Sequence, residues 1–102
     1  MQQLAMTHVK QREHCIDIRL AQSFDEDDVE SIAESLIQRH LDARTIENIS
    51  GADRFNARFI LNSSTFVLNF EIYSQSCWID IESSELNNDF YHILTTLQQH
   101  IR

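Results

Sequence analysis

The sequence contains no proline, a single glycine (Gly51) and no low-complexity tract. Disordered chains are usually rich in Pro and Gly and poor in branched and aromatic residues. Because this chain is 42% hydrophobic and has six Phe residues, we expect it to be ordered along nearly its whole length. The lone glycine also excludes the Gly-rich loops that hold phosphates and the Gly-x-Ser-x-Gly turn of serine hydrolases.

Lysine is almost absent too. Lys10 is the only one, and the formal net charge is −8. Nucleic-acid binding draws most of its affinity from cations that neutralise phosphates, so we expect no nucleic-acid partner. The same charge argues against binding to an anionic membrane surface.

Long apolar segments are missing as well. The clean apolar runs are short, as at 59–61 and 66–68, whereas a transmembrane helix needs about 20 residues. The first residues carry neither a basic segment nor a long apolar stretch, so no secretory signal is expected. Cysteine is limited to Cys15 and Cys77, while small secreted domains usually carry a larger set. We therefore predict reduced thiols and a cytoplasmic location.

The first part of the chain shows one clear strand pattern. Residues 1–13 are weakly patterned, although the alternation of Leu4 and Met6 is compatible with a short strand. Between His14 and Leu20 apolar and polar residues alternate strictly, which is typical of a half-buried strand. Ile16, Ile18 and Leu20 form one side, and the other, more exposed side carries Cys15, Asp17 and Arg19.

An amphipathic helix is predicted from about Phe24 to Leu41. Ser23 and Glu26 have the spacing of a capping box, with Ser23 as the N-cap. Acidic residues fill the first turn, where the positive end of the helix dipole favours them. One apolar stripe follows at helical spacing: Val29, Ile32, Ala33, Leu36, Ile37 and Leu41.

The second half predicts a meander and a final helix. Residues 45–50 favour a short strand, and three alternating segments follow at 54–61, 65–73 and 77–82, the second ending at Tyr73. Their short connections require antiparallel hairpins. Ser83-Ser84-Glu85 then predicts an N-cap, and an apolar stripe at helical spacing continues to the end of the chain: Leu86, Phe90, Ile93, Leu94, Leu97 and Ile101.

These elements predict one α+β domain over residues 1–102, in the order β-α-(β)-β-β-β-α. Since each helix has one apolar stripe and the sheet one apolar face, the expected architecture is a two-layer sandwich. An antiparallel sheet of four to five strands would carry both helices on one face. We expect these residues to be nearly fully buried: Ile16, Ile18, Leu36, Phe59, Phe70, Ile79, Phe90 and Leu94.

No residue pattern predicts a catalytic, cofactor or metal site. The five histidines lack the close pair that a zinc site usually contains. Asp80 and Glu82 share a strand face that is predicted to be solvated, where nothing would separate their pKa values. One alternative stays open, namely a small enzyme or metal-binding protein that uses His14, Cys15 and nearby carboxylates.

The surfaces of the predicted fold favour a non-enzymatic protein-binding, adaptor or regulatory module. The sheet face without helices would carry residue types enriched at interface hot spots. Acids also cluster between Asp25 and Glu34, where they would suit a basic partner. The expected partner is a protein or a second copy of the chain. The candidate interaction residues are Trp78, Tyr73, Arg58, Asn69 and Asp80.

Overall fold

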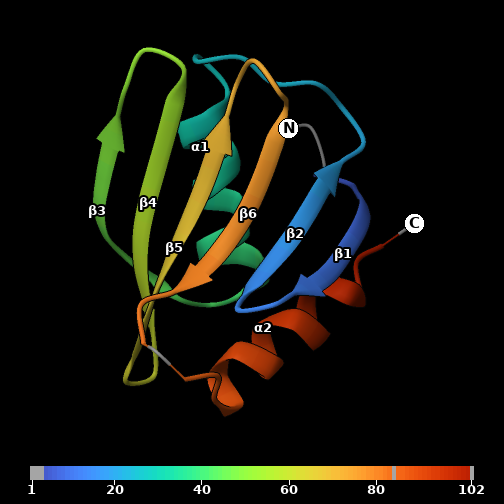
Figure 1. Ribbon diagram of the computed structural model, residues 1–102. Coiled ribbons are helices and arrows are strands. Elements are labelled where there is room, and N and C mark those ends of the chain that lie inside the picture. Colours follow the sequence, from blue (N-terminus) through green and yellow to red (C-terminus); the bar gives the residue numbers. More distant parts are fainter. Residues whose placement is uncertain (1–3, 84, 102) are drawn as a thin grey trace.

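In the computed structural model, which describes residues 4–83 and 85–101, an open antiparallel sheet carries two helices (Figure 1). The strands are β1 (Met6–Arg12), β2 (Cys15–Leu20), β3 (Arg44–Ser50), β4 (Arg54–Leu61), β5 (Ser64–Glu71) and β6 (Ser76–Ile81). The helices are α1 (Val29–Glu34), which runs directly into the π-helical segment η1 (Ser35–His40), and α2 (Asn88–Gln98).

The sheet order is β1-β2-β6-β5-β4-β3, and every neighbouring pair is antiparallel. The predicted α+β class and the β4–β5–β6 meander are confirmed. The described residues contain six strands rather than four or five, because the weakly patterned start of the chain supplies β1.

A β-bulge explains why β1 left no alternating pattern in the sequence. The register of β1 on β2 shifts between Met6 and His8, so Thr7 is an extra residue in the strand. Met6 and Val9, three positions apart, are consequently both buried. A bulge inserts one residue and reverses the phase of the alternation beyond it.

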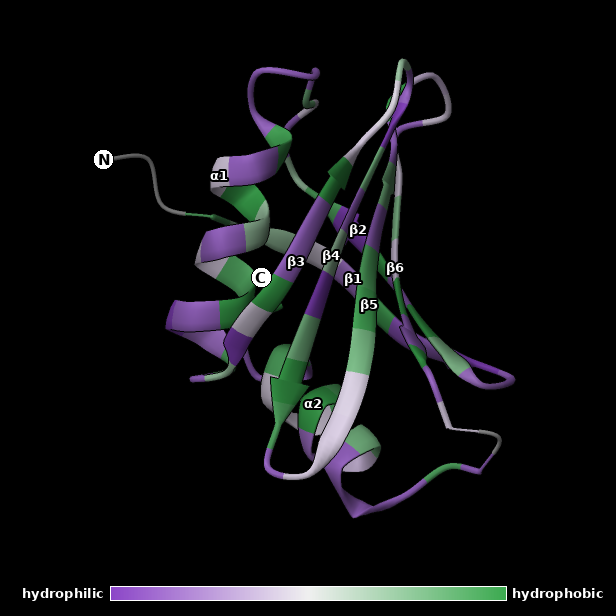
Figure 2. Cartoon of the chain, turned by 90° about the vertical axis from the view of Figure 1, so that its left-hand side faces the viewer, coloured by the Kyte–Doolittle hydropathy of each residue, from purple (hydrophilic) through white to green (hydrophobic). Residues whose placement is uncertain are grey.

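Both helices lie on one side of the sheet and leave its other side bare (Figure 2). The covered side holds the phenylalanines of β4 and β5, and Phe70 packs against the rings of Phe24 and Phe55 at centroid distances of 5.4 and 6.2 Å. Of the eight residues predicted to be nearly fully buried, seven are. The exception is Leu94, which is only partly buried because its neighbour Ile93, together with Leu97, faces the core.

The first helix starts later than predicted, and Ser23 is not its cap. A helical turn begins at Asp25, whose Oδ1 accepts the amide of Asp27 at 2.9 Å. Asp28 Oδ2 accepts the amide of Asp25 at 3.0 Å in return, so the turn before α1 has the reciprocal bonding of a capping box, while Asp28, the N-cap of α1 itself, makes no side-chain capping hydrogen bond. Phe24 stays outside the helix because its amide and carbonyl are both held by the side chain of Gln75, at 2.8 and 2.7 Å.

The predicted single helix also changes type along its length. From Ser35 to His40 the backbone is a π-helix, with Leu41 donating to the carbonyl of Leu36 at 3.1 Å. The wider turn keeps Leu36, Ile37 and Leu41 buried together, although an α-helix would bring Leu36 and His40 one above the other.

The second helix begins after the predicted cap. Asn87 is its N-cap, and the side-chain oxygen of Asn87 accepts the amide of Phe90 at 2.9 Å. Ser83 instead accepts the amide of Glu85 in a bend before the helix, and Ser84 lies outside the described residues. The helix ends at Gln98 rather than at the end of the chain, and Ile101 forms a parallel bridge with Met6.

Candidate functional site on the open face of the sheet

The bare side of the sheet, which we call the open face, is built from alternate residues of all six strands. Strand register aligns these residues in rows that cross the sheet. One row runs from β3 to β1 through Ile49, Asn56, Asn69, Trp78, Asp17 and Lys10. The next runs through Glu47, Arg58, Val67, Asp80, Cys15 and Arg12.

A hydrogen-bonded cluster around Trp78 occupies the centre of this face. The indole Nε1 of Trp78 and the side-chain amide of Asn69 both donate to Asp80 Oδ2, each at 3.1 Å. Asn69 also receives a hydrogen bond from the side chain of Asn56 and donates to the carbonyl of Val67 at 3.1 Å. Asn69 is 7% exposed, while Trp78 is half-buried and lines a surface hollow. The side chains therefore hold Trp78 in one orientation on an accessible surface.

Ion pairs surround the cluster. Arg58 binds the carboxylate of Glu82 through two hydrogen bonds of 2.9 Å and lies 3.7 Å from Glu47. This pairing lowers the pKa of Glu82 below its usual range. Arg12 makes a two-point contact with Asp17 at 2.6 and 3.0 Å, which lowers the pKa of Asp17 in the same way.

The five predicted interaction residues do not all lie together. Trp78, Asn69 and Asp80 form one cluster, and Arg58 lies in the same row as Asp80. Tyr73 is separate. Strand β5 ends at Glu71, so Tyr73 stands in the β5–β6 turn with 87% of its surface exposed.

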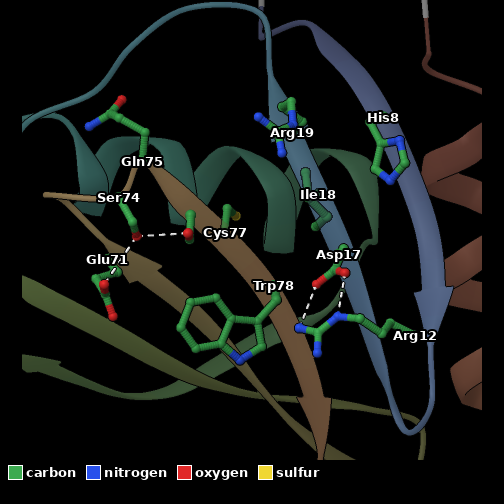
Figure 3. A pocket seen from close by; sticks show the side chains of 11 residues that line it. His8, Arg12, Asp17, Ile18, Arg19, Glu71, Ser74, Gln75, Cys77 and Trp78 are labelled. Carbon is green, nitrogen blue, oxygen red and sulfur yellow. Dashed lines mark hydrogen bonds and ion pairs between the residues drawn. The ribbon is translucent and has the colours of Figure 1, made fainter.

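A shallow hollow of about 400 Å³ lies beside Trp78, between β1, β2, β6 and the β5–β6 turn. In Figure 3, His8 and Arg19 stand on β1 and β2 at one side of the hollow, and Glu71 and Ser74 stand at the other. Arg12, Asp17 and Trp78 close its lower end. The lining is mainly polar and carries charges of both signs, which suits contact with a polar protein surface.

The predicted alternative site around His14 and Cys15 has a different geometry from the one expected. Cys15 was placed on the exposed side of its strand, but it is only 9% exposed, and its Sγ donates to the carbonyl of Arg12 at 3.2 Å. Burial raises the pKa of Cys15, which disfavours a reactive thiolate. Within residues 4–83 and 85–101, no group of three or more His, Cys, Asp or Glu side chains is placed to hold a metal ion.

The two cysteines cannot form a disulfide with each other in this fold. Cys77 faces the core opposite Ile18, and Cys15 faces the open side opposite Asp80. Both are free thiols.

Charge is divided unevenly between the two sides of the molecule. Six of the seven Lys and Arg residues that the structure describes belong to the open face: Lys10, Arg12, Arg19, Arg44, Arg54 and Arg58. They meet five acids there, namely Asp17, Glu47, Glu71, Asp80 and Glu82. The open face is therefore close to neutral, and the net negative charge of the chain comes from the helix side and the loops.

Sequence reasoning missed part of this site. Asn56 donates to Asn69 of the Trp78 cluster, and Asp17 lies opposite Trp78 and pairs with Arg12; both occupy the non-core positions of their strands. Because they alternate with core residues, the sequence predicts that both lie on the open face. The residues that they contact there depend on the order of the strands in the sheet. β2 lies next to β6 although more than fifty residues separate them, and no local pattern predicts that neighbour.

Within the described ranges, no helix is long and apolar enough to cross a bilayer. Comparison with curated proteins and with solved structures finds no match. A family model matches residues 4–99, a segment that contains all the strands and helices described above. The chain belongs to DUF3630, a family of proteins of unknown function.

Proposed function

We propose that this chain is a cytoplasmic, non-enzymatic protein-binding module that acts through the open face of its sheet, with the acidic helix side as a second contact surface. The partner is another protein or a second copy of the chain. Free thiols at Cys15 and Cys77 fit a reducing compartment.

The observation that carries the proposal is the fixed, accessible indole of Trp78. Trp is among the residue types that contribute most to binding energy at interfaces. Because Asp80 accepts a hydrogen bond from the indole at 3.1 Å, the ring is already held in place before any partner arrives. Binding then loses less side-chain entropy than it would with a freely rotating ring.

The charge distribution supports the same surface. A second acidic molecule is repelled by the helix side, which holds most of the negative charge, but meets a nearly balanced set of charges on the open face. Like-charge contacts oppose association, whereas a mixed surface allows complementary pairing.

The test is a native-mass measurement over a range of concentrations, combined with capture of partners on immobilised chain. A specific interface through the open face is expected to bury roughly 1,200–2,000 Å² in total. Trp78→Ala is expected to shift the native mass toward the monomer, or to abolish capture. Tyr91→Ala is the matched control, because Tyr91 is an aromatic residue that is 45% exposed on α2, away from this face.

Urea unfolding of the same variants separates binding from folding. The proposal requires that Trp78→Ala reduce association far more than it lowers the free energy of unfolding. A large loss of stability with unchanged association would assign Trp78 a purely structural role and would contradict the proposal.

A further inference from the structure

The two edge strands of the sheet, β1 and β3, differ in their contacts with the rest of the chain. At the β1 edge, the side chain of Gln98 donates to the carbonyl of Val9 at 3.1 Å, and Ile101 forms a bridge with Met6. The residues around and after the end of α2 therefore occupy this edge at two points, Val9 and Met6. At the other edge, six of the seven residues of β3 are exposed, and no backbone hydrogen bond joins its outer side to another described segment.

The hydrogen-bond pattern identifies which groups of β3 are free. Gly51 donates to the carbonyl of Arg54 at 2.7 Å, at the hairpin end of the β3–β4 ladder. Because bonded and non-bonded pairs alternate along an antiparallel ladder, Ile49 and Glu47 direct their backbone groups toward β4. Asn48 and Ser50 consequently present their N–H and C=O groups to the outside.

β3 lacks most of the devices that block strand edges. It contains neither Lys nor Pro, its charged residues Arg44 and Glu47 lie on the open face, and its one bulge, between Thr45 and Glu47, leaves the stretch that follows it regular. Ile46 and Ile49 are 46% and 52% exposed and add apolar surface to the edge. Such an edge is suited to accept another extended strand.

The helix side of this edge is acidic. On the side facing the helix, Glu30 and Glu34 line a small hollow together with Asn48 of β3. On the open face the charges are mixed, because Glu47 lies 3.7 Å from Arg58 and Arg44 of β3 is exposed there. A strand added to β3 would therefore place its side chains next to carboxylates on the helix side.

We propose that the free edge of β3 binds an extended, basic segment of a partner protein by strand addition, with backbone pairing to Asn48 and Ser50 and Lys or Arg side chains against Glu30 and Glu34. This proposal rests on the proposed protein-binding function but uses a different surface from Trp78. A second copy of β3 fits less well, because it would bring the Glu30 and Glu34 of two molecules together.

The experiment measures binding of a fluorescent seven-residue peptide in which Lys alternates with Val, matched to the seven residues of β3. Asn48→Pro removes an outward N–H without removing a bond to β4, and Asn48→Ala, which keeps that N–H, is its matched control. We expect Asn48→Pro to weaken binding by about tenfold or more, as loss of a backbone hydrogen bond and a steric clash imply. Asn48→Ala should change the affinity less than about twofold by the same reasoning.

The charge contribution is tested in parallel. The double variant Glu30→Lys/Glu34→Lys should weaken binding of the Lys/Val peptide by about tenfold, while the control Glu85→Lys, an equal charge change per site at an exposed bend, should not. A Glu/Val peptide should not bind. Hydrogen exchange at the amides of Asn48 and Ser50 should slow when the Lys/Val peptide is added.

Several outcomes would overturn the proposal. One is that the Asn48→Pro and Asn48→Ala variants bind the Lys/Val peptide with equal affinity. Another is that the Glu/Val peptide binds as well as the Lys/Val peptide. A third is a homodimer that Asn48→Pro dissociates but that the Lys/Val peptide does not displace. If Asn48→Pro does not fold, a Lys/Val peptide N-methylated at alternate residues gives the same test. This peptide keeps its charge but lacks the backbone N–H donors that would pair with β3. If it still binds, the proposal is contradicted. Trp78→Ala should leave the affinity for the Lys/Val peptide unchanged. A failure of the β3 edge to bind peptide can therefore be distinguished from a failure of the open face to bind a partner.

Discussion

Trp78 and Asp80 are two positions apart on β6, so they share the open face, and the indole Nε1 donates to Asp80 Oδ2 at 3.1 Å. The same oxygen accepts from the nearly buried Asn69. One carboxylate thus orients both an aromatic ring and an amide, whereas Glu82 on the same face only pairs with the exposed Arg58.

Asp80→Ala should therefore destabilise the fold more than Glu82→Ala does. Removing the shared acceptor leaves the indole N–H without its partner, at a cost of about 1–2 kcal/mol. Glu82→Ala loses a surface ion pair that contributes about 0–1 kcal/mol. Urea unfolding measures both values, and a Glu82 variant that is the more destabilised of the two would contradict the central role of Asp80.

Phe70→Ala should be among the most damaging substitutions in the core. Phe70 is 1% exposed and packs edge-on against Phe24 and obliquely against Phe55. Losing a buried aromatic ring and leaving a cavity costs about 3–5 kcal/mol. Phe70→Leu, which fills much of the space, should cost clearly less, and a neutral Phe70→Ala in urea unfolding would refute the assignment of the covered face.

The helix cap gives a prediction opposite to the one made from the sequence. Asp25→Ala removes the side chain that holds the turn before α1 and should destabilise by about 1 kcal/mol, comparable to the loss of a helix cap. Ser23→Ala should have little effect, because Ser23 is exposed and the capping contacts begin at Asp25. Chemical denaturation of the Asp25→Ala and Ser23→Ala variants measures both effects. A larger loss of stability for Ser23→Ala would instead support a helix that is capped by Ser23.

His40 predicts a loss of stability in mild acid. Burial, followed by the nearby charge of His100, whose ring lies 4.5 Å away between centroids, lowers the pKa of His40 below its ordinary 6.5 in the folded state. The unfolded chain therefore binds a proton more readily, and stability falls as the pH drops through 6.5 toward the folded pKa. His40→Gln should flatten this part of the stability–pH curve measured by urea unfolding, and an unchanged slope would contradict the assignment of this pH dependence to His40.

The sequence predicted the elements whose patterns are purely local. In strands β4, β5 and β6 the core residues recur at every second position, so both the presence of these strands and their buried faces followed from period two. β1 did not, because the bulge at Thr7 places Met6 and Val9 on one side at a spacing of three. A single inserted residue breaks the period-two alternation from which a strand is predicted.

The start of the first helix shows a second limit. Ser23 with Glu26, and Asp25 with Asp28, both have the spacing of a capping box. The choice between them is made by Gln75, which holds the backbone of Phe24 from 51 positions away in the sequence. The same holds for the candidate site, where the neighbours of Trp78 on β2 depend on strand order, which no local pattern contains.

The unequal charge of the two sides acts before any contact is made. At about 0.01 M salt the Debye length is about 30 Å, similar to the 32 Å long dimension of the molecule, so an approaching protein senses which side it faces. At physiological salt this reach falls to about 8 Å. In dilute salt, the electrostatic field therefore orients an acidic protein toward the sheet side and a basic protein toward the helices. At physiological salt this orientation is much weaker. Ionic strength should accordingly alter the rate at which partners arrive in a productive orientation more than the rate at which they leave.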